Sequence, residues 1–228
     1  MASNRERLRG LYAVTPETAD TASLVARSRM ALEGGARLLQ YRAKSMDAAT
    51  ALDQARRLAA ECRKAGALFI VNDSVDLALA AGADGVHLGR GDVAIAAARA
   101  RLPAGIVGVS CYADPESARA AAAAGADYVA IGSVHPSRTK PAAVRAPREA
   151  IAAAGRASGL PVAAIGGITP ANAAALVQAG ADMLAVISAL FDAADVRAAA
   201  RAFTRAFDRR EAPSKEEMPD VRAQPRPL

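Results

Sequence analysis

The chain has 228 residues, which is enough for one large hydrophobic core. Hydrophobic residues make up 52% of it, whereas aromatic residues make up only 4% and Trp is absent. This composition argues against a β-sandwich and against an aromatic surface that stacks on nucleic acid bases. The formal net charge is +6, but the excess Arg is scattered rather than clustered, so we expect no nucleic-acid partner.

The cysteines and the hydropathy bear on location. Cys62 and Cys111 match neither a metal-ligand spacing nor a disulfide framework, which favours free thiols in a reducing compartment. No apolar run reaches 18 residues, and the N-terminus lacks the apolar core of a signal peptide. We therefore expect a cytoplasmic protein without a membrane partner. A homo-oligomer is compatible with the sequence, which does not specify the oligomeric state.

Short runs rich in Val, Ile and Leu alternate with Ala-rich stretches of helical length. Such near-continuous apolar strands between helices indicate a parallel sheet that is covered on both faces. Eight units in this length favour one closed (β/α)8 TIM barrel, of the α/β class. The strands are expected at 11–15, 38–42, 68–72, 85–89, 106–110, 128–132, 162–166 and 184–188, with helices that include 47–65, 114–124, 170–179 and 192–209.

An internal repeat supports this organisation. The sequence Ala-Gly-Ala-Asp occurs at 81–84, 124–127 and 179–182, and 34–37 is a looser copy. Each copy precedes an even-numbered strand, where its Gly can end the preceding helix in the left-handed conformation. The repeat is thus predicted to be structural. The catalytic barrel should occupy residues 9–209, between a loose N-terminus at 1–8 and a disordered tail at 210–228.

Polar side chains collect where the strands end, which is where barrels of this kind place their active sites. After the second strand, alternation directs Gln40, Arg42 and Lys44 to the same side. Arg suits bidentate contact with phosphate, and Lys adds a compact positive charge. A solvated strand end is the plainer alternative, but a phosphate site explains the three groups better.

Asp73 follows the third strand and Asp92 follows the fourth. Each could simply cap the helix that comes after it. Because the ends of adjacent strands are close neighbours, the two carboxylates could also face one Mg²⁺ ion that binds a diphosphate. Their position beside Arg42 and Lys44 favours the metal site.

The loop after the sixth strand, 132–140, carries hydroxyl groups, an Arg and a Lys, and is long enough to close over a site. His135 in this loop could be a base or could have a structural role, and His87 within the fourth strand is interpreted as structural. The Gly166-Gly167 pair after the seventh strand, together with Ser188 after the eighth, matches the common phosphate site of TIM barrels. The residues thus predict a diphosphate site and a monophosphate site, which suits an enzyme that joins two phosphorylated substrates and releases pyrophosphate.

These residues resemble the thiamine-phosphate synthase (thiamine-phosphate pyrophosphorylase) family from about Leu11 to Ser188. Each motif is weak alone, but their order and spacing together are specific. The motifs are Gln40-Tyr41-Arg42-Ala43-Lys44, Val71-Asn72-Asp73, Gly85-Val86-His87-Leu88-Gly89 with Asp92, Gly108-Val109-Ser110, Thr139-Lys140, Ile165-Gly166-Gly167-Ile168-Thr169 and Val186-Ile187-Ser188. The sequence departs from the family at Ser74, where a second Asp is frequent, and at Ser137, where Thr is common.

The resemblance implies a transferase that condenses 4-amino-2-methyl-5-(diphosphooxymethyl)pyrimidine with thiazole phosphate, or with its 2-carboxylated form, to give thiamine phosphate and pyrophosphate. It implies Mg²⁺ as cofactor, held by Asp73 and Asp92, and catalytic roles for Lys140, Arg42 and Ser110. The pyrimidine diphosphate would contact Gln40, Tyr41, Arg42, Ala43, Lys44, Asn72, Ser110 and Lys140. The thiazole phosphate would contact Ser137, Thr139, Gly167, Ile187 and Ser188.

Two alternatives remain at this point. The first is a thiazole tautomerase-like protein of the same fold, against which the full set of diphosphate residues argues. The second is a non-catalytic barrel that senses a phosphorylated metabolite, which the Asp73 and Asp92 pair and Lys140 make less favourable.

Overall fold

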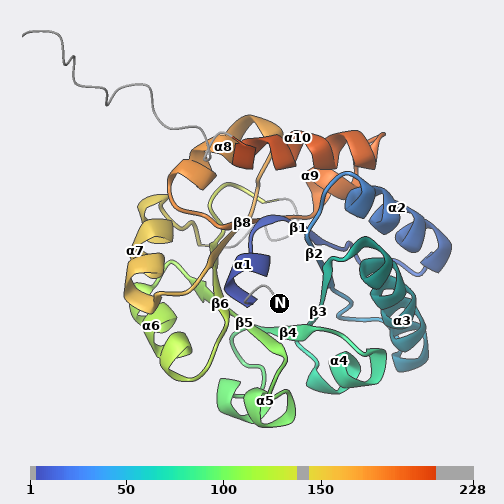
Figure 1. Ribbon diagram of the computed structural model, residues 1–228, viewed down its shortest axis with the longest axis horizontal. Helices are drawn as coiled ribbons and strands as arrows, with labels where there is room; N and C mark the ends of the chain where they lie inside the picture. The colour runs from blue at the N-terminus through green and yellow to red at the C-terminus, as the bar shows by residue number, and fades with distance from the viewer. Residues whose placement is uncertain (1–3, 138–143, 209–228) are drawn as a thin grey trace, which may run out of the picture.

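The computed structural model describes residues 4–137 and 144–208, so the predicted tail at 210–228 lies outside the described part of the chain. Eight parallel strands pair in chain order, and β8 closes on β1. The predicted TIM barrel is confirmed, with helices surrounding the ring of strands (Figure 1). The strands are β1 Gly10–Val14, β2 Leu38–Tyr41, β3 Leu68–Asn72, β4 Gly85–Leu88, β5 Ile106–Tyr112, β6 Tyr128–Gly132, β7 Val162–Ile165 and β8 Met183–Val186.

The predicted helices at 47–65, 114–124 and 170–179 agree with the structure to within one residue at each end, whereas the one at 192–209 differs and is discussed below. The helices of the described chain are α1 Asn4–Arg7, α2 Thr21–Glu33, α3 Ala48–Ala65, α4 Val75–Ala81, α5 Ile95–Arg101, α6 Pro115–Ala123, α7 Glu149–Ser158, α8 Pro170–Gln178, α9 Ser188–Phe191 and α10 Val196–Asp208. None of these described helices is both long enough and apolar enough to cross a membrane.

Alternation along the strands divides the buried side chains between two cores. The larger core lies between the sheet and the surrounding helices, and includes Leu39, Phe69 and Val129. The smaller core fills the inside of the barrel, and includes Tyr12, Ile70 and Tyr128. The barrel interior is therefore packed with side chains.

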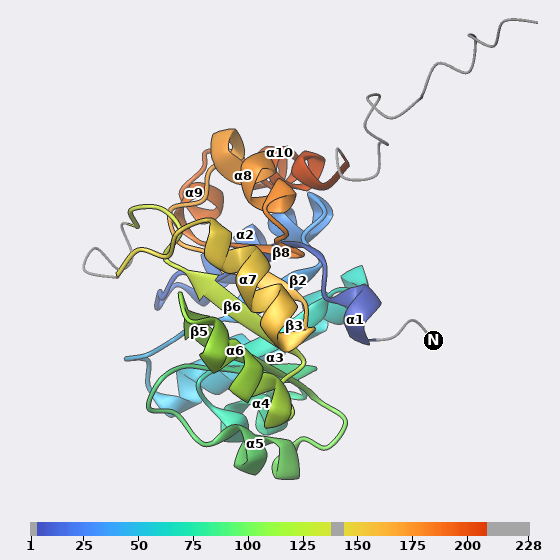
Figure 2. The same cartoon turned by 90° about the vertical axis from the view of Figure 1, so that its left-hand side faces the viewer.

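In the N-terminal segment, residues 1–3 lie outside the described part of the chain, so the expectation of a loose segment at 1–8 stays a prediction. Asn4–Arg7 forms the short helix α1, which lies at the end of the barrel opposite the β6–α7 connection (Figure 2). Leu8 is only 1% exposed and packs in the core inside the barrel. Leu8 thus closes the amino-terminal end of the interior, and burial of its side chain stabilises that end.

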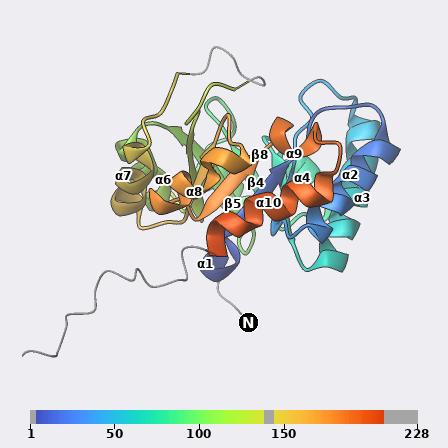
Figure 3. The ribbon, with the colours of Figure 1, turned by 90° about the horizontal axis from the view of Figure 1, so that it is seen from above.

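The connection after β8 also differs from the predicted helix at 192–209. The short helix α9 comes first, and α10 begins only at Val196. Asp195 starts α10, because its carboxylate accepts a hydrogen bond from the backbone N–H of Ala198 at 2.9 Å. Figure 3 shows α10 running across the outside of the barrel beside α9 and α2.

The Ala-Gly-Ala-Asp repeat has the structural role that the sequence predicted. Its glycines have positive φ angles, for example 64° at Gly82 and 95° at Gly125. The aspartates add a second function, since Asp84 accepts a hydrogen bond from the Phe69 N–H at 2.8 Å, and Asp127 does the same for Val107. Each such Asp ties an even strand to the preceding odd strand at the amino-terminal end of the barrel.

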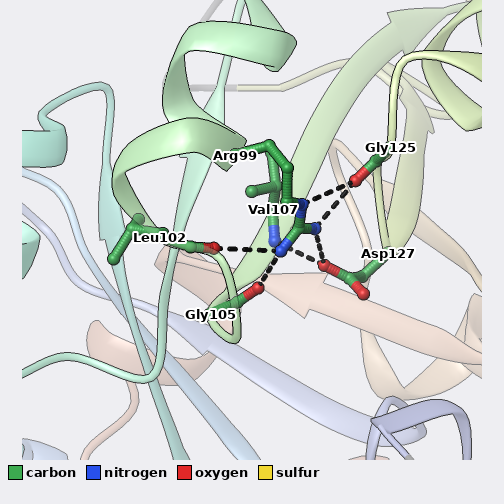
Figure 4. Close-up of polar contacts among 6 residues, drawn as sticks. All are labelled: Arg99, Leu102, Gly105, Val107, Gly125 and Asp127. Atoms are coloured by element: carbon green, nitrogen blue, oxygen red, sulfur yellow. Dashed lines mark hydrogen bonds and ion pairs between the residues drawn. The ribbon is translucent and has the colours of Figure 1, made fainter.

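Arg99 reinforces one of these ties. Its guanidinium group contacts the carboxylate of Asp127 and the backbone carbonyls of Leu102, Gly105 and Gly125 (Figure 4). The Asp127 carboxylate thus bridges the Val107 backbone and a cation from α5. This cluster stabilises the end of the barrel that lies away from the site.

Candidate active site

A cavity of about 1190 Å³ opens at the carboxyl ends of the strands. Each of the eight strands contributes at least one residue to its wall, so the site belongs to the barrel as a whole. The cavity is large enough for two small ligands side by side.

Four of the predicted pyrimidine diphosphate residues line this cavity together, although they come from three different strands and one loop. They are Gln40, Arg42, Asn72 and Ser110. The backbone of Arg42 is fixed because its N–H donates to the hydroxyl of Thr15 at 3.0 Å. The structure therefore brings these groups together; their contact with substrate stays a prediction.

Tyr41 and Ala43 lie differently from their neighbours. The Tyr41 side chain is 1% exposed and packs in the core between sheet and helices, where its hydroxyl donates to Gln54 Oε1 at 2.8 Å. Ala43 packs against the same core. Alternation explains this result: odd positions of this segment face outward, so a substrate could meet only their backbone atoms.

Asp73 and Asp92 do not cap helices. Ser74 caps α4, and α5 begins after Ala94 without any side-chain cap. Instead Asp92 Oδ2 accepts a hydrogen bond from the Gly89 N–H at 2.6 Å, and the two carboxyl groups lie near enough for each to shift the pKa of the other. The helix-cap alternative is thus wrong for both residues.

The backbone and the charges explain how this pair is held. Asp73 has a φ of 65°, a left-handed conformation that is uncommon outside Gly, and its carboxylate forms an ion pair with Lys44 at 2.8 Å. Burial raises the pKa of Asp92, and the negative charge of Asp73 raises it further. Burial acts against the charge of Asp73 as well, but hydrogen bonds with Lys44 and Asp92 outweigh it and lower the pKa of Asp73.

The predicted monophosphate residues Ser137, Gly167, Ile187 and Ser188 line the same cavity from the β6, β7 and β8 side. Gly166 and Gly167 have φ angles of 103° and 60°. A Cβ atom at Gly167 would lie 2.2 Å from the carbonyl oxygen of Pro136, so only Gly fits there. Thr139 and Lys140 lie outside the described residues.

The short helix α9, which begins at Ser188, is held from its other end. Arg27 on α2 donates hydrogen bonds to the backbone carbonyls of Phe191 and Ala193, the latter at 2.8 Å. These are the orphan carbonyls at the carboxyl end of a helix, which favour a cation. The contact with Arg27 therefore fixes the position of Ser188 in the cavity wall.

Several cavity-lining residues were missed in the sequence. Arg90 and Tyr112 meet at the rim, where the guanidinium carbon lies 4.8 Å from the ring centroid. Tyr112 has a φ of 57° and follows a register shift in β5, which no sequence pattern indicated. Both ring nitrogens of His87 have a hydrogen-bond partner, as its structural interpretation expected. His87 also lines the cavity.

A closed barrel with glycine-lined and cation-lined regions at the carboxyl ends of its strands defines an enzyme of the TIM-barrel class that handles phosphorylated small molecules. Comparison with known proteins narrows this class. The profile described as "Thiamine monophosphate synthase" matches residues 11–190. The chain belongs to this family, and it is an enzyme of the transferase class.

Individual relatives agree with the profile. The chain is 57% identical over 203 residues to a thiamine-phosphate synthase of Aromatoleum aromaticum, with 89% of this chain and 98% of the relative covered. It is 58% identical over 205 residues to one of Chromobacterium violaceum, covering 90% and 99%. A solved thiamine phosphate pyrophosphorylase from Pyrococcus furiosus superposes with a TM-score of 0.83 at 36% identity, covering 92% of this chain and 100% of that one.

Proposed function

We propose that this chain joins 4-amino-2-methyl-5-(diphosphooxymethyl)pyrimidine to thiazole phosphate and releases thiamine phosphate and pyrophosphate. Membership of the family supports the reaction. One observation supports the assignment of the site most directly. A single cavity has Arg42 and Ser110 in one part of its wall and Gly167 and Ser188 in another. A cytoplasmic location is part of the proposal, and the two free buried cysteines support it.

The two carboxylates fit the predicted Mg²⁺ ion. Asp73 and Asp92 lie close enough that the negative charge of Asp73 disfavours that of Asp92. Mg²⁺ is usually bound by one or two carboxylates together with water and substrate phosphate oxygens. When bound, Mg²⁺ would neutralise charge that develops on the departing diphosphate.

The side chains of the chain itself have a defined task in this reaction. The bond between the pyrimidine methylene carbon and the diphosphate oxygen breaks, and the electron pair leaves with pyrophosphate. Arg42, Ser110 and the predicted Lys140 stabilise that leaving group electrostatically. The lone pair of the thiazole nitrogen then forms the new carbon–nitrogen bond, and since this nitrogen carries no proton, the step needs no general base.

The cavity wall also protects the intermediate. The wall also includes small and apolar side chains from the last three strands and from the residue after β8: Ala130, Ala163, Ile165, Ala185 and Ile187. Such a wall brings the two substrates together without offering a nucleophile to the pyrimidine methylene cation. Exclusion of water from this region would prevent hydrolysis from competing with condensation.

The direct test supplies purified protein with Mg²⁺, the pyrimidine diphosphate and thiazole phosphate. We expect pyrophosphate and thiamine phosphate in a one-to-one ratio. A parallel reaction with the 2-carboxylated thiazole phosphate, with CO₂ measured, determines which form is used. Isomerisation of the thiazole without pyrophosphate release would instead support the tautomerase alternative, and binding without any turnover would support the sensor alternative.

A further inference from the structure

A continuous line of hydrogen bonds crosses the floor of the cavity inside the barrel. Gln40 Nε2 donates to the hydroxyl of Tyr12 at 2.7 Å, and that hydroxyl lies 2.8 Å from the hydroxyl of Tyr128. The Tyr128 hydroxyl lies 2.9 Å from His87 Nδ1, and His87 Nε2 lies 2.9 Å from Ser110 Oγ. The line therefore joins Gln40 and Ser110, which are both predicted to contact substrate. The three residues between them have no predicted contact with substrate.

Packing holds the middle of this line in place. The ring of Tyr128 stacks on His87 at 5.6 Å between centroids and meets Tyr12 edge-on at 6.0 Å. Gly108 makes space for it, because a Cβ atom there would lie 2.0 Å from Tyr128 Cζ. Tyr128 is 0% exposed and does not line the cavity, so water cannot replace its hydrogen-bond partners, whereas Tyr12 lies at the cavity wall.

The number of available protons determines which group donates in each hydrogen bond of this line. Burial raises the pKa of both Tyr12 and Tyr128, so each phenol keeps its single proton. Tyr12 already accepts from Gln40, and if it also accepted from Tyr128, its own proton would have no acceptor among the described residues. A buried hydroxyl without a partner is unfavourable, so Tyr12 donates to Tyr128, and Tyr128 donates to His87 Nδ1.

We propose that Tyr12, Tyr128 and His87 are positioning residues that act through Ser110. They orient the His87 ring so that Nε2, at 2.9 Å from Ser110 Oγ, donates its proton to that oxygen. The serine oxygen is thereby occupied as an acceptor, and its own proton points into the cavity as a donor. This deepens the proposed function, on which it rests: a serine fixed as a donor stabilises the negative charge of the departing pyrophosphate.

The state of His87 can be measured without any substrate. The chain has two histidines, so the ¹⁵N spectrum of the His135→Gln variant contains the side-chain signals of His87 alone. We expect a protonated Nε2 and an unprotonated Nδ1 in the folded protein. The spectrum distinguishes the two cases because the ¹⁵N shifts of protonated and unprotonated ring nitrogens are well separated. A proton on Nδ1, or on both nitrogens, overturns the proposal, whether or not the protein makes thiamine phosphate.

Kinetics test the action through Ser110. Tyr128→Phe removes one hydroxyl, and we expect kcat to fall about tenfold, the size of effect typical for one hydrogen bond. In a Ser110→Ala background the same change should cause no further loss of kcat, because the Ser110 hydroxyl through which Tyr128 acts is already absent. Equal losses in both backgrounds would contradict the proposal. If Tyr128→Phe does not fold, Tyr12→Phe makes the same comparison.

Val129→Ala is the matched control. Val129 neighbours Tyr128 on β6 but is buried on the outer face of the strand, in the core between sheet and helices. We expect this variant to lose stability while its kcat and its His87 spectrum stay unchanged. If the wild-type protein shows no turnover at all, the proposed function fails, and the spectrum alone then decides the state of His87.

Discussion

Asp73 and Asp92 come from two loops that follow adjacent strands, and each carboxyl group shifts the pKa of the other. Lys44 pairs with Asp73, while the Gly89 N–H is bound to Asp92, so each member has one fixed partner of its own. The pair is therefore positioned by the chain before any ligand arrives. Such preorganisation is what a site for electrostatic catalysis needs.

Asp92→Asn tests this pair while keeping the size of the side chain. The amide oxygen can still accept from the Gly89 N–H, so the loop should keep its shape. We expect kcat/KM to fall about 100-fold, as for loss of one preorganised charge-stabilising group, and the Mg²⁺ concentration for half-maximal activity to rise. Asp53→Asn, at an exposed carboxylate on α3, is the control. Full activity at the wild-type Mg²⁺ requirement would contradict the metal assignment.

The backbone of Tyr112, at the rim of the cavity, has a strained conformation. Its φ of 57° is sterically unfavourable for a bulky residue, and the register shift in β5 places it there. We expect Tyr112→Gly to be more stable to urea than Tyr112→Ala by about 1 kcal/mol, because only Gly adopts this conformation without cost. Equal unfolding free energies for the two variants would show that the conformation is not strained.

At the scale of elements, the strands were predictable because Val, Ile and Leu runs of four to five residues are separated by clear helix signals. Asp47 and Gly66 bound α3 as an N-cap and a left-handed terminus, the pattern expected from sequence. What the sequence could not indicate depends on contacts between distant segments. The Arg27 contact that holds α9, the burial of Leu8 and the shift in β5 are such cases.

The residues of the site likewise divide into those that the sequence could predict and those that depend on contacts between distant segments. Gln40 and Arg42 were predictable because strand ends meet at one face of a barrel, whereas Asn72 and Ser110 were predicted through the family resemblance. Alternation correctly separated Arg42 from its neighbour Tyr41, whose side chain faces the helices. The link from Tyr12 to Ser110 was not predictable, since it spans four strands and depends on interatomic distances.

The aspartates of the repeat can be compared as elements of stability. Asp84→Ala should lower the free energy of unfolding by about 1–2 kcal/mol, since the Phe69 N–H loses its partner. Asp127→Ala should cost about 1 kcal/mol more, because Arg99 also loses its ion pair. Urea denaturation measures both. Neither change should alter kcat, because both residues lie at the amino-terminal end of the barrel, and a matching loss of activity would contradict that separation.

At the scale of the whole molecule, one cavity is lined by residues of both predicted anion sites, which come from different strands. Arg42 follows β2, whereas Ser188 follows β8 and begins α9. If the two sites take different ligands, each ligand should stabilise the folded protein through its own residues. Ligand at 100 times its Kd adds about 2.7 kcal/mol, which is a rise in Tm of roughly 5–10 °C for a domain of this size.

We therefore expect a double dissociation in thermal unfolding. Mg²⁺ with pyrophosphate should raise the Tm of the wild type and of Ser188→Ala, but should have little effect on Arg42→Ala. Thiazole phosphate should raise the Tm of the wild type and of Arg42→Ala, but should have little effect on Ser188→Ala. Each variant is the control for the other, since both lack one polar group of the same cavity. If either variant loses its response to both ligands, the anions share one site, and the division of the cavity between pyrimidine diphosphate and thiazole phosphate is wrong.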